Sequence, residues 1–191
     1  QWEKIKIPFK ISVDLKKEMI AAYRREFNSG IFYRYWQNMQ MAANYCLQNN
    51  INIDEAIEWA DRSINTYFGE KNFSTLSTYA GLLEKKGMKA KADSAMQIAY
   101  PLATTLQLYS YGRGLENQKR NAEAIAVYKK SFDKNPNDLY ALMAITRGYS
   151  LQGNNKEALK YANKTLTFAK DTYFAQYAQE VIANLKEGKP I

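Results

Sequence analysis

The sequence predicts an all-α fold of helical hairpins that repeat along the chain, with one isolated β-strand at its N-terminal end. Three observations support this prediction. Residues 121–132 and 155–166 follow one pattern, 34 residues apart. Stretches with the 3.6-residue apolar period of a helix lie on both sides of this repeat. The first 13 residues instead alternate between apolar and polar side chains, which is the period of a strand.

The N-terminal alternation predicts a strand with one apolar face. That face consists of Ile5, Ile7, Phe9, Ile11 and Val13. Pro8 has no N–H to donate, so we expect an edge strand or a bulge there. No second strand of similar quality follows, and we therefore expect its partners in an upstream β domain or in a neighbouring chain that pairs through residues 5–13. The sequence starts at Gln1 rather than Met, and we expect that a preceding segment has been removed.

Helices are expected next at about residues 15–27 and 32–48. Asp14 is suited to cap the first of these, and Gly30 to end it. A third helix contains Ala60, and Asn52 with Glu55 has the spacing of a capping box at its start.

Residues 73–100 predict a hairpin of two further helices with its turn at Gly87. Gly87 precedes Ala92 by five positions, as Gly153 precedes Ala158, which supports this alignment. Pro101 is expected in the first turn of the helix that follows.

A closing helix is expected at about residues 172–186. Its apolar stripe consists of Phe174, Tyr177, Val181 and Leu185. Its other face is polar, as the last helix of a stacked array requires.

Composition limits the chemistry that this chain can perform. It has 191 residues with a net charge of +8 and no histidine, the commonest acid–base group and metal ligand near neutral pH. The lone Cys46 lies on an apolar helix face, where a buried thiol is more common than a nucleophile. We therefore expect no enzyme, no catalytic residues, no cofactor and no metal site.

Charged residues have two possible interpretations. Asp54, Glu55, Glu58 and Asp61 would suit either a metal site or the first turns of a helix, where the helix dipole favours acidic side chains. The basic excess is spread along the chain without an arginine-rich run, so we expect solvated faces and no nucleic-acid partner. No apolar run is long enough to span a membrane.

The repeated segments resemble the tetratricopeptide repeat family. The pattern is carried in one repeat by Leu108, Tyr111, Gly112, Leu115, Ala124, Tyr128, Ser131 and Pro136, and in the next by Leu142, Ile145, Tyr149, Ala158 and Thr165. In the second of these repeats Thr146 replaces the small glycine, Ala162 the aromatic residue and Lys170 the proline. The resemblance implies a right-handed solenoid with small residues where paired helices cross. It divides the chain into a strand (1–13), a linking helix (14–30), four repeats (31–170) and a capping helix with a tail (171–191).

The resemblance also implies a binding groove, because the first helix of each repeat lines the concave side of such an array. The expected partner-binding residues are Tyr109, Arg113 and Glu116 in one repeat, and Tyr140, Met143 and Arg147 in the next. If both arginines are free, they favour an acidic protein or peptide partner. Alternatively, both arginines pair with Glu116 and other acids of the groove.

Two classes of function remain open. The first is a non-catalytic scaffold that binds a protein or peptide on its concave face. The second is a structural helical appendage of a β domain that lies upstream and carries the activity. The N-terminal strand followed by these repeats also looks like a set of uncharacterised bacterial secreted proteins in which a β-sandwich precedes tetratricopeptide-like helices. That likeness implies a location outside the cytoplasm.

Overall fold

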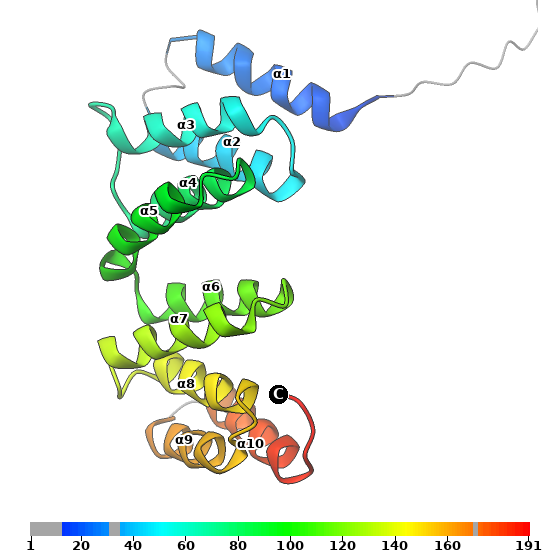
Figure 1. The fold of residues 1–191 in the computed structure, drawn as a ribbon, viewed down its shortest axis with the longest axis vertical. Coiled ribbons are helices and arrows are strands. Elements are labelled where there is room, and N and C mark those ends of the chain that lie inside the picture. Colours follow the sequence, from blue (N-terminus) through cyan, green and yellow to red (C-terminus); the bar gives the residue numbers. More distant parts are fainter. Residues whose placement is uncertain (1–12, 31–34, 170–171) are drawn as a thin grey trace, which may run out of the picture. The chain divides into compact units, whose positions relative to one another are not determined.

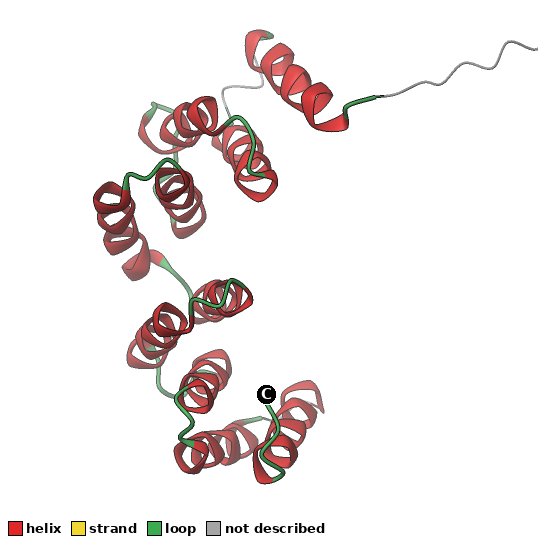
Figure 2. Cartoon of the chain, turned by 45° about the vertical axis from the view of Figure 1, so that its right-hand side comes forward, coloured by secondary structure: helices red, strands yellow, loops and turns green. Residues whose placement is uncertain are grey.

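The computed structural model describes residues 13–30, 35–169 and 172–191, and this part of the chain is all-α (Figures 1 and 2). Its ten helices are α1 (Leu15–Asn28), α2 (Trp36–Asn49), α3 (Ile53–Asn65), α4 (Phe73–Lys85), α5 (Lys89–Leu102), α6 (Thr105–Asn117), α7 (Asn121–Lys134), α8 (Leu139–Leu151), α9 (Asn155–Phe168) and α10 (Thr172–Lys186). The predicted helical hairpins are confirmed, since α2 packs on α3, α6 on α7 and α8 on α9. The described residues contain no β-strand. The strand predicted for residues 5–13 lies outside them, except for Val13.

The chain forms two compact units, which divide after Met96 within α5. The N-terminal unit has a core built from small side chains on α2 and α3. Ala42, Ala43 and Cys46 of α2 and Ala56 of α3 are completely buried. Side chains of this size let two helices approach closely, as the repeat pattern predicted.

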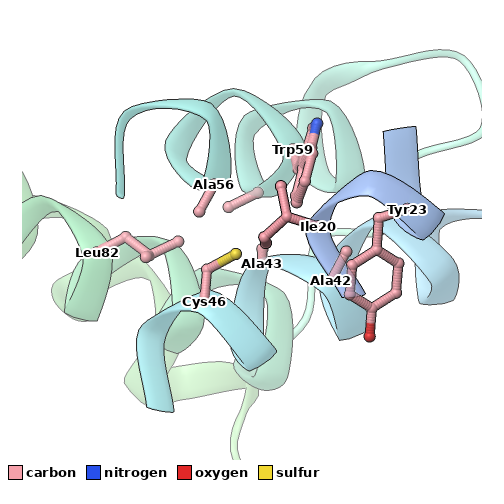
Figure 3. Close-up of a cluster of buried hydrophobic side chains, with 9 residues drawn as sticks. Ile20, Tyr23, Ala42, Ala43, Cys46, Ala56, Trp59 and Leu82 are labelled. Atoms are coloured by element: carbon pink, nitrogen blue, oxygen red, sulfur yellow. The ribbon is translucent and has the colours of Figure 1, made fainter. Parts of the chain in front are cut away.

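Helix α1 adds an aromatic layer to this core (Figure 3). Ile20 and Tyr23 lie against the α2–α3 pair, and the Tyr23 ring meets the Trp59 ring edge to face, with centroids 6.1 Å apart. Phe27 contacts Trp59 in the same manner at 5.2 Å. Edge-to-face contacts of this kind stabilise aromatic pairs beyond the area that they bury.

The helix ends confirm some of the predicted caps and correct one of them. The Asp14 carboxylate accepts hydrogen bonds from the backbone N–H groups of Lys16 and Lys17, as expected for an N-cap. The capping box predicted at Asn52 and Glu55 is wrong. Asn52 has a left-handed backbone (φ 51°), and its side chain accepts no hydrogen bond from the helix. Its amide instead donates to Glu55 Oε2 at 2.7 Å.

The C-terminal unit contains the clearest repeats, and its small positions are buried as predicted. Ala124 and Ala158 are completely buried. Gly112 faces the ring of Tyr128, and a Cβ at Gly112 would lie 2.3 Å from Tyr128 Cε1. The predicted turn glycines Gly87 and Gly153, one in each unit, both have positive φ.

The position expected for Pro101 is wrong, because it lies in the last turn of α5 and not in the first turn of α6. Helix α6 begins at Thr105, after a capping box in which the side chains of Thr104 and Gln107 bond reciprocally to backbone N–H groups. This cap fixes the start of α6 four residues beyond the proline. Across the described residues, none of the helices combines the length and the apolar character that crossing a bilayer requires.

Candidate functional site

The six residues predicted to bind a partner lie on one face of α6 and α8 in the C-terminal unit. Tyr109, Arg113 and Glu116 follow one another at helical spacing on α6, as Tyr140, Met143 and Arg147 do on α8. Helix α8 packs against both α6 and α10, so that these three helices share a surface. We call this surface the α6–α8–α10 face.

A buried ion pair joins the two repeats at this face. Arg147 Nε donates to Glu116 Oε1 at 2.9 Å, and Arg147 Nη2 donates to Glu116 Oε2 at 2.5 Å. The two side chains are 7% and 11% exposed. The hydroxyl of Tyr128 donates to Glu116 Oε1 as well. Both carboxylate oxygens of Glu116 are therefore occupied within the protein.

The ionisation of this cluster follows from its contacts. Burial of Glu116 acts to raise its pKa, but the hydrogen bonds from Arg147 and Tyr128 and the charges of Arg147 and Arg113 outweigh burial and lower it. Burial likewise acts to lower the pKa of Arg147, and Glu116 more than compensates, so that this pKa is raised. The pair is therefore charged at neutral pH.

Arg113, the equivalent arginine one repeat earlier, is placed differently. It is partly buried, and no ion pair of Arg113 occurs among the described residues. Its Nε atom is buried and has no hydrogen-bond partner in the described part of the chain. The two alternatives left open by the sequence therefore each describe one arginine. Arg147 is paired with Glu116, and Arg113 keeps donors that are unused.

Aromatic rings form a continuous row beside this cluster. The Tyr109 and Tyr140 ring centroids are 6.0 Å apart, and Phe174 of α10 contacts Tyr140 at 5.2 Å. Tyr173 extends the row, 5.3 Å from Phe174, and is 65% exposed. The rings cross all three helices of the face and provide rigid contact area.

Tyr177 of α10 completes the polar part of the face. Burial first, and then the neighbouring Tyr177 phenol, raise the pKa of Tyr109 to about 12. Tyr177 also contributes to the raised pKa of Arg147. Its hydroxyl is nevertheless buried without a hydrogen bond that satisfies normal geometry among the described residues, as is Arg113 Nε. Two donors with unused capacity therefore lie on the same face.

Sequence reasoning assigned Phe174 and Tyr177 to the apolar stripe of a capping helix and not to the binding face. The signal was present, because they lie 34 residues after Tyr140 and Met143. Extending the repeat into α10 would have placed them beside the predicted residues. Met143 itself is only 3% exposed, so it supports the face from beneath.

Comparison with solved structures gives likenesses at low sequence identity. YrrB, described as a TPR protein with an unusual peptide-binding site, has a TM-score of 0.45 and 18% identity, covering 86% of this chain and 85% of its own. Two structures of MamA have TM-scores of 0.46 and 0.47 with 19% identity, covering 83% and 80% of this chain and 96% and 84% of theirs. The predicted likeness to tetratricopeptide proteins is thus found again among solved structures. No family model matches the chain, and no curated protein matches it.

The acidic residues at the start of α3 take part in ion pairs. Glu55 accepts hydrogen bonds from Arg24 at 2.7–3.1 Å, and Asp54 lies 2.5 Å from the Lys86 ammonium. In the described ranges, no three histidine, cysteine or acidic side chains gather in a way that could hold a metal ion. Cys46 is completely buried, and burial followed by the charge of Glu55 raises its thiol pKa to about 11.

Proposed function

We propose that the α6–α8–α10 face binds an extended segment of a protein or peptide partner, and that Arg113 pairs with a carboxylate of that segment. The observation that carries this proposal is the buried Arg113 Nε, which has no partner among the described residues. A guanidinium with unused donors is suited to the planar fork of a carboxylate.

Charge at the face supports an acidic ligand. Arg147 and Glu116 neutralise each other, and Arg113 adds one positive charge that none of the described ion pairs balances. A single carboxylate would neutralise the cluster. In a partly buried site such a pair gains more than it does on an open surface, because water screens it less.

The row of rings supports an extended ligand with apolar side chains. Tyr109, Tyr140 and Phe174 are fixed by contacts with one another. Rigid aromatic side chains often dominate binding energy because they lose little entropy when a ligand docks. An aspartate or glutamate beside an aromatic or aliphatic residue would satisfy both parts of the face. The proposed role is a scaffold that binds and does not catalyse.

The proposal is tested with peptides selected from a random display library on the full chain. Their affinities are then measured by fluorescence anisotropy, with each acidic residue of the peptide also replaced by alanine. Arg113→Ala should weaken binding by more than about tenfold, and removing the matching acid from the peptide should add little further loss. Lys156→Ala, which removes an exposed cation from α9, is the matched control and should change affinity less than about twofold.

Because Arg147 forms a buried ion pair, its replacement would disturb folding and binding together. Arg113→Ala should leave the melting temperature nearly unchanged. Selected peptides that bind the Arg113→Ala variant as tightly as the wild-type chain would contradict the proposed site.

A further inference from the structure

A second pocket lies on the opposite side of α8 from the α6–α8–α10 face. It has a volume of about 350 Å³ and is lined by α7 and by the C-terminal half of α8. On α8 the lining residues Ile145, Gly148 and Gln152 alternate in helical register with Met143 and Arg147 and point to the other side. The volume is within the range of small-molecule sites in proteins.

The walls of this pocket are apolar, and its rings are held in place. Phe132 and Tyr149 face the pocket from α7 and α8. Tyr161 of α9 meets Phe132 edge to face at 5.2 Å and stacks on Tyr149 at 5.5 Å with an interplanar angle of 10°. One tyrosine therefore fixes both aromatic walls, and the pocket is formed before any ligand enters.

Gly148 keeps the pocket open. A Cβ at this position would have Tyr128 Cβ as its nearest neighbour at 3.6 Å, which is an ordinary contact. Packing therefore does not require glycine here, in contrast to Gly112. A glycine inside a helix costs about 0.5–1 kcal/mol relative to alanine. A large side chain at position 148 would project into the space that the pocket occupies.

The rim carries one charge of each sign. Lys129 and Asp133 lie one turn apart on α7, both are exposed, and neither forms an ion pair or a hydrogen bond with another described residue. Gln152 faces them from α8 with an amide that can donate and accept. The lysine is complementary to a carboxylate, and the aspartate to an ammonium group.

We propose that this pocket binds a free α-amino acid with an aromatic side chain. The ring enters between Phe132 and Tyr149 above Gly148, the carboxylate pairs with Lys129, and the ammonium pairs with Asp133. Aromatic rings prefer edge-to-face and offset contacts of the kind that these walls offer. This site is separate from the proposed peptide-binding face, and neither proposal depends on the other.

The test uses the full chain with L-phenylalanine as the probe, followed by saturation-transfer NMR and calorimetry. Three analogues separate the interactions: 3-phenylpropionate lacks the ammonium, 2-phenylethylamine lacks the carboxylate, and N-acetyl-L-phenylalaninamide lacks both charges. L-Phenylalanine should bind at least about tenfold more tightly than each of them, since each loses a charge-assisted hydrogen bond.

Three variants locate the site. Gly148→Leu should abolish binding by filling the pocket, while Lys129→Gln and Asp133→Asn should each weaken it about tenfold. Lys130→Gln is the matched control, because Lys130 lies over the Tyr100 ring and outside the pocket. Circular dichroism checks folding, and the two exposed rim variants keep the test valid if Gly148→Leu unfolds.

Three results would overturn the proposal. The first is no binding of L-phenylalanine at millimolar concentration. The second is equal binding of the uncharged analogue, which would indicate a pocket for a partner's aromatic side chain. The third is unchanged affinity in the rim variants.

Discussion

The close contact between Gly112 and Tyr128 predicts that adding one methyl group on α6 destabilises the C-terminal unit. In Gly112→Ala the new Cβ would lie 2.3 Å from Tyr128 Cε1 and 2.8 Å from Cδ1. Tyr128 is completely buried, and its hydroxyl is hydrogen-bonded to Glu116, so that the ring has little room to retreat. The helices must therefore separate or the ring must leave its preferred rotamer.

Gly114, two residues further along α6, provides a matched control. A Cβ at Gly114 has nothing within 4 Å. Both substitutions gain about 0.5–1 kcal/mol because alanine loses less backbone entropy than glycine in a helix. Their difference therefore isolates the steric conflict. We expect Gly112→Ala to be less stable than Gly114→Ala by about 1–3 kcal/mol, the usual cost of overpacking.

The assay is urea unfolding followed by far-ultraviolet circular dichroism. Tryptophan fluorescence is unsuitable, because Trp2, Trp36 and Trp59 all precede the C-terminal unit. Shrinking the ring in a Tyr128→Leu background should remove most of the difference between the two alanine variants. Equal stabilities of Gly112→Ala and Gly114→Ala in the wild-type background would refute the reasoning.

Three further predictions concern other buried groups. Glu116→Gln should cost about 3–5 kcal/mol, since it leaves the buried Arg147 uncompensated. The lowered pKa of Glu116 means that its contribution is present above the ordinary glutamate pKa and is lost as the pH falls through the lowered folded value. Urea titrations between pH 7 and pH 3 should therefore show a decline in the wild-type chain that the variant lacks in part. Ala158→Leu should destabilise by about 1–3 kcal/mol in thermal melts, whereas the exposed Lys160→Leu should cost little, and similar melts would contradict the helix register. Cys46, buried with a pKa of about 11, should react with a thiol reagent at pH 8 only after urea unfolds the chain, and rapid reaction before unfolding would contradict its burial.

The sequence alone determined the features that depend on periodicity. The 34-residue offset between Ala124 and Ala158 is enough to predict paired helices, because only small side chains permit so close an approach. The same offset placed Arg113 and Arg147 on one surface. It would also have added Phe174 and Tyr177, had it been extended into the last helix.

Local signals were less reliable where several helix ends competed. The spacing of Asn52 and Glu55 predicted a capping box, but Glu55 bonds Arg24 from α1, a residue far away in the sequence. Pro101 suited the start of a helix by its own preference, yet Thr104 and Gln107 cap α6 and leave the proline at the end of α5. Caps depend on which partner is nearest in space, and the sequence does not contain that distance.

The tertiary structure alone decided how the two equivalent arginines differ. Arg113 and Arg147 occupy the same position of successive repeats, so periodicity predicts the same role for both. Glu116 has only two carboxylate oxygens, and these are taken by Arg147 and Tyr128, which reach it from α8 and α7. Arg147 thereby becomes part of the core, while Arg113 Nε stays unpaired among the described residues. A repeat pattern determines which residues face the same way, but the finite number of acceptors in the folded chain determines which of them remains free to bind.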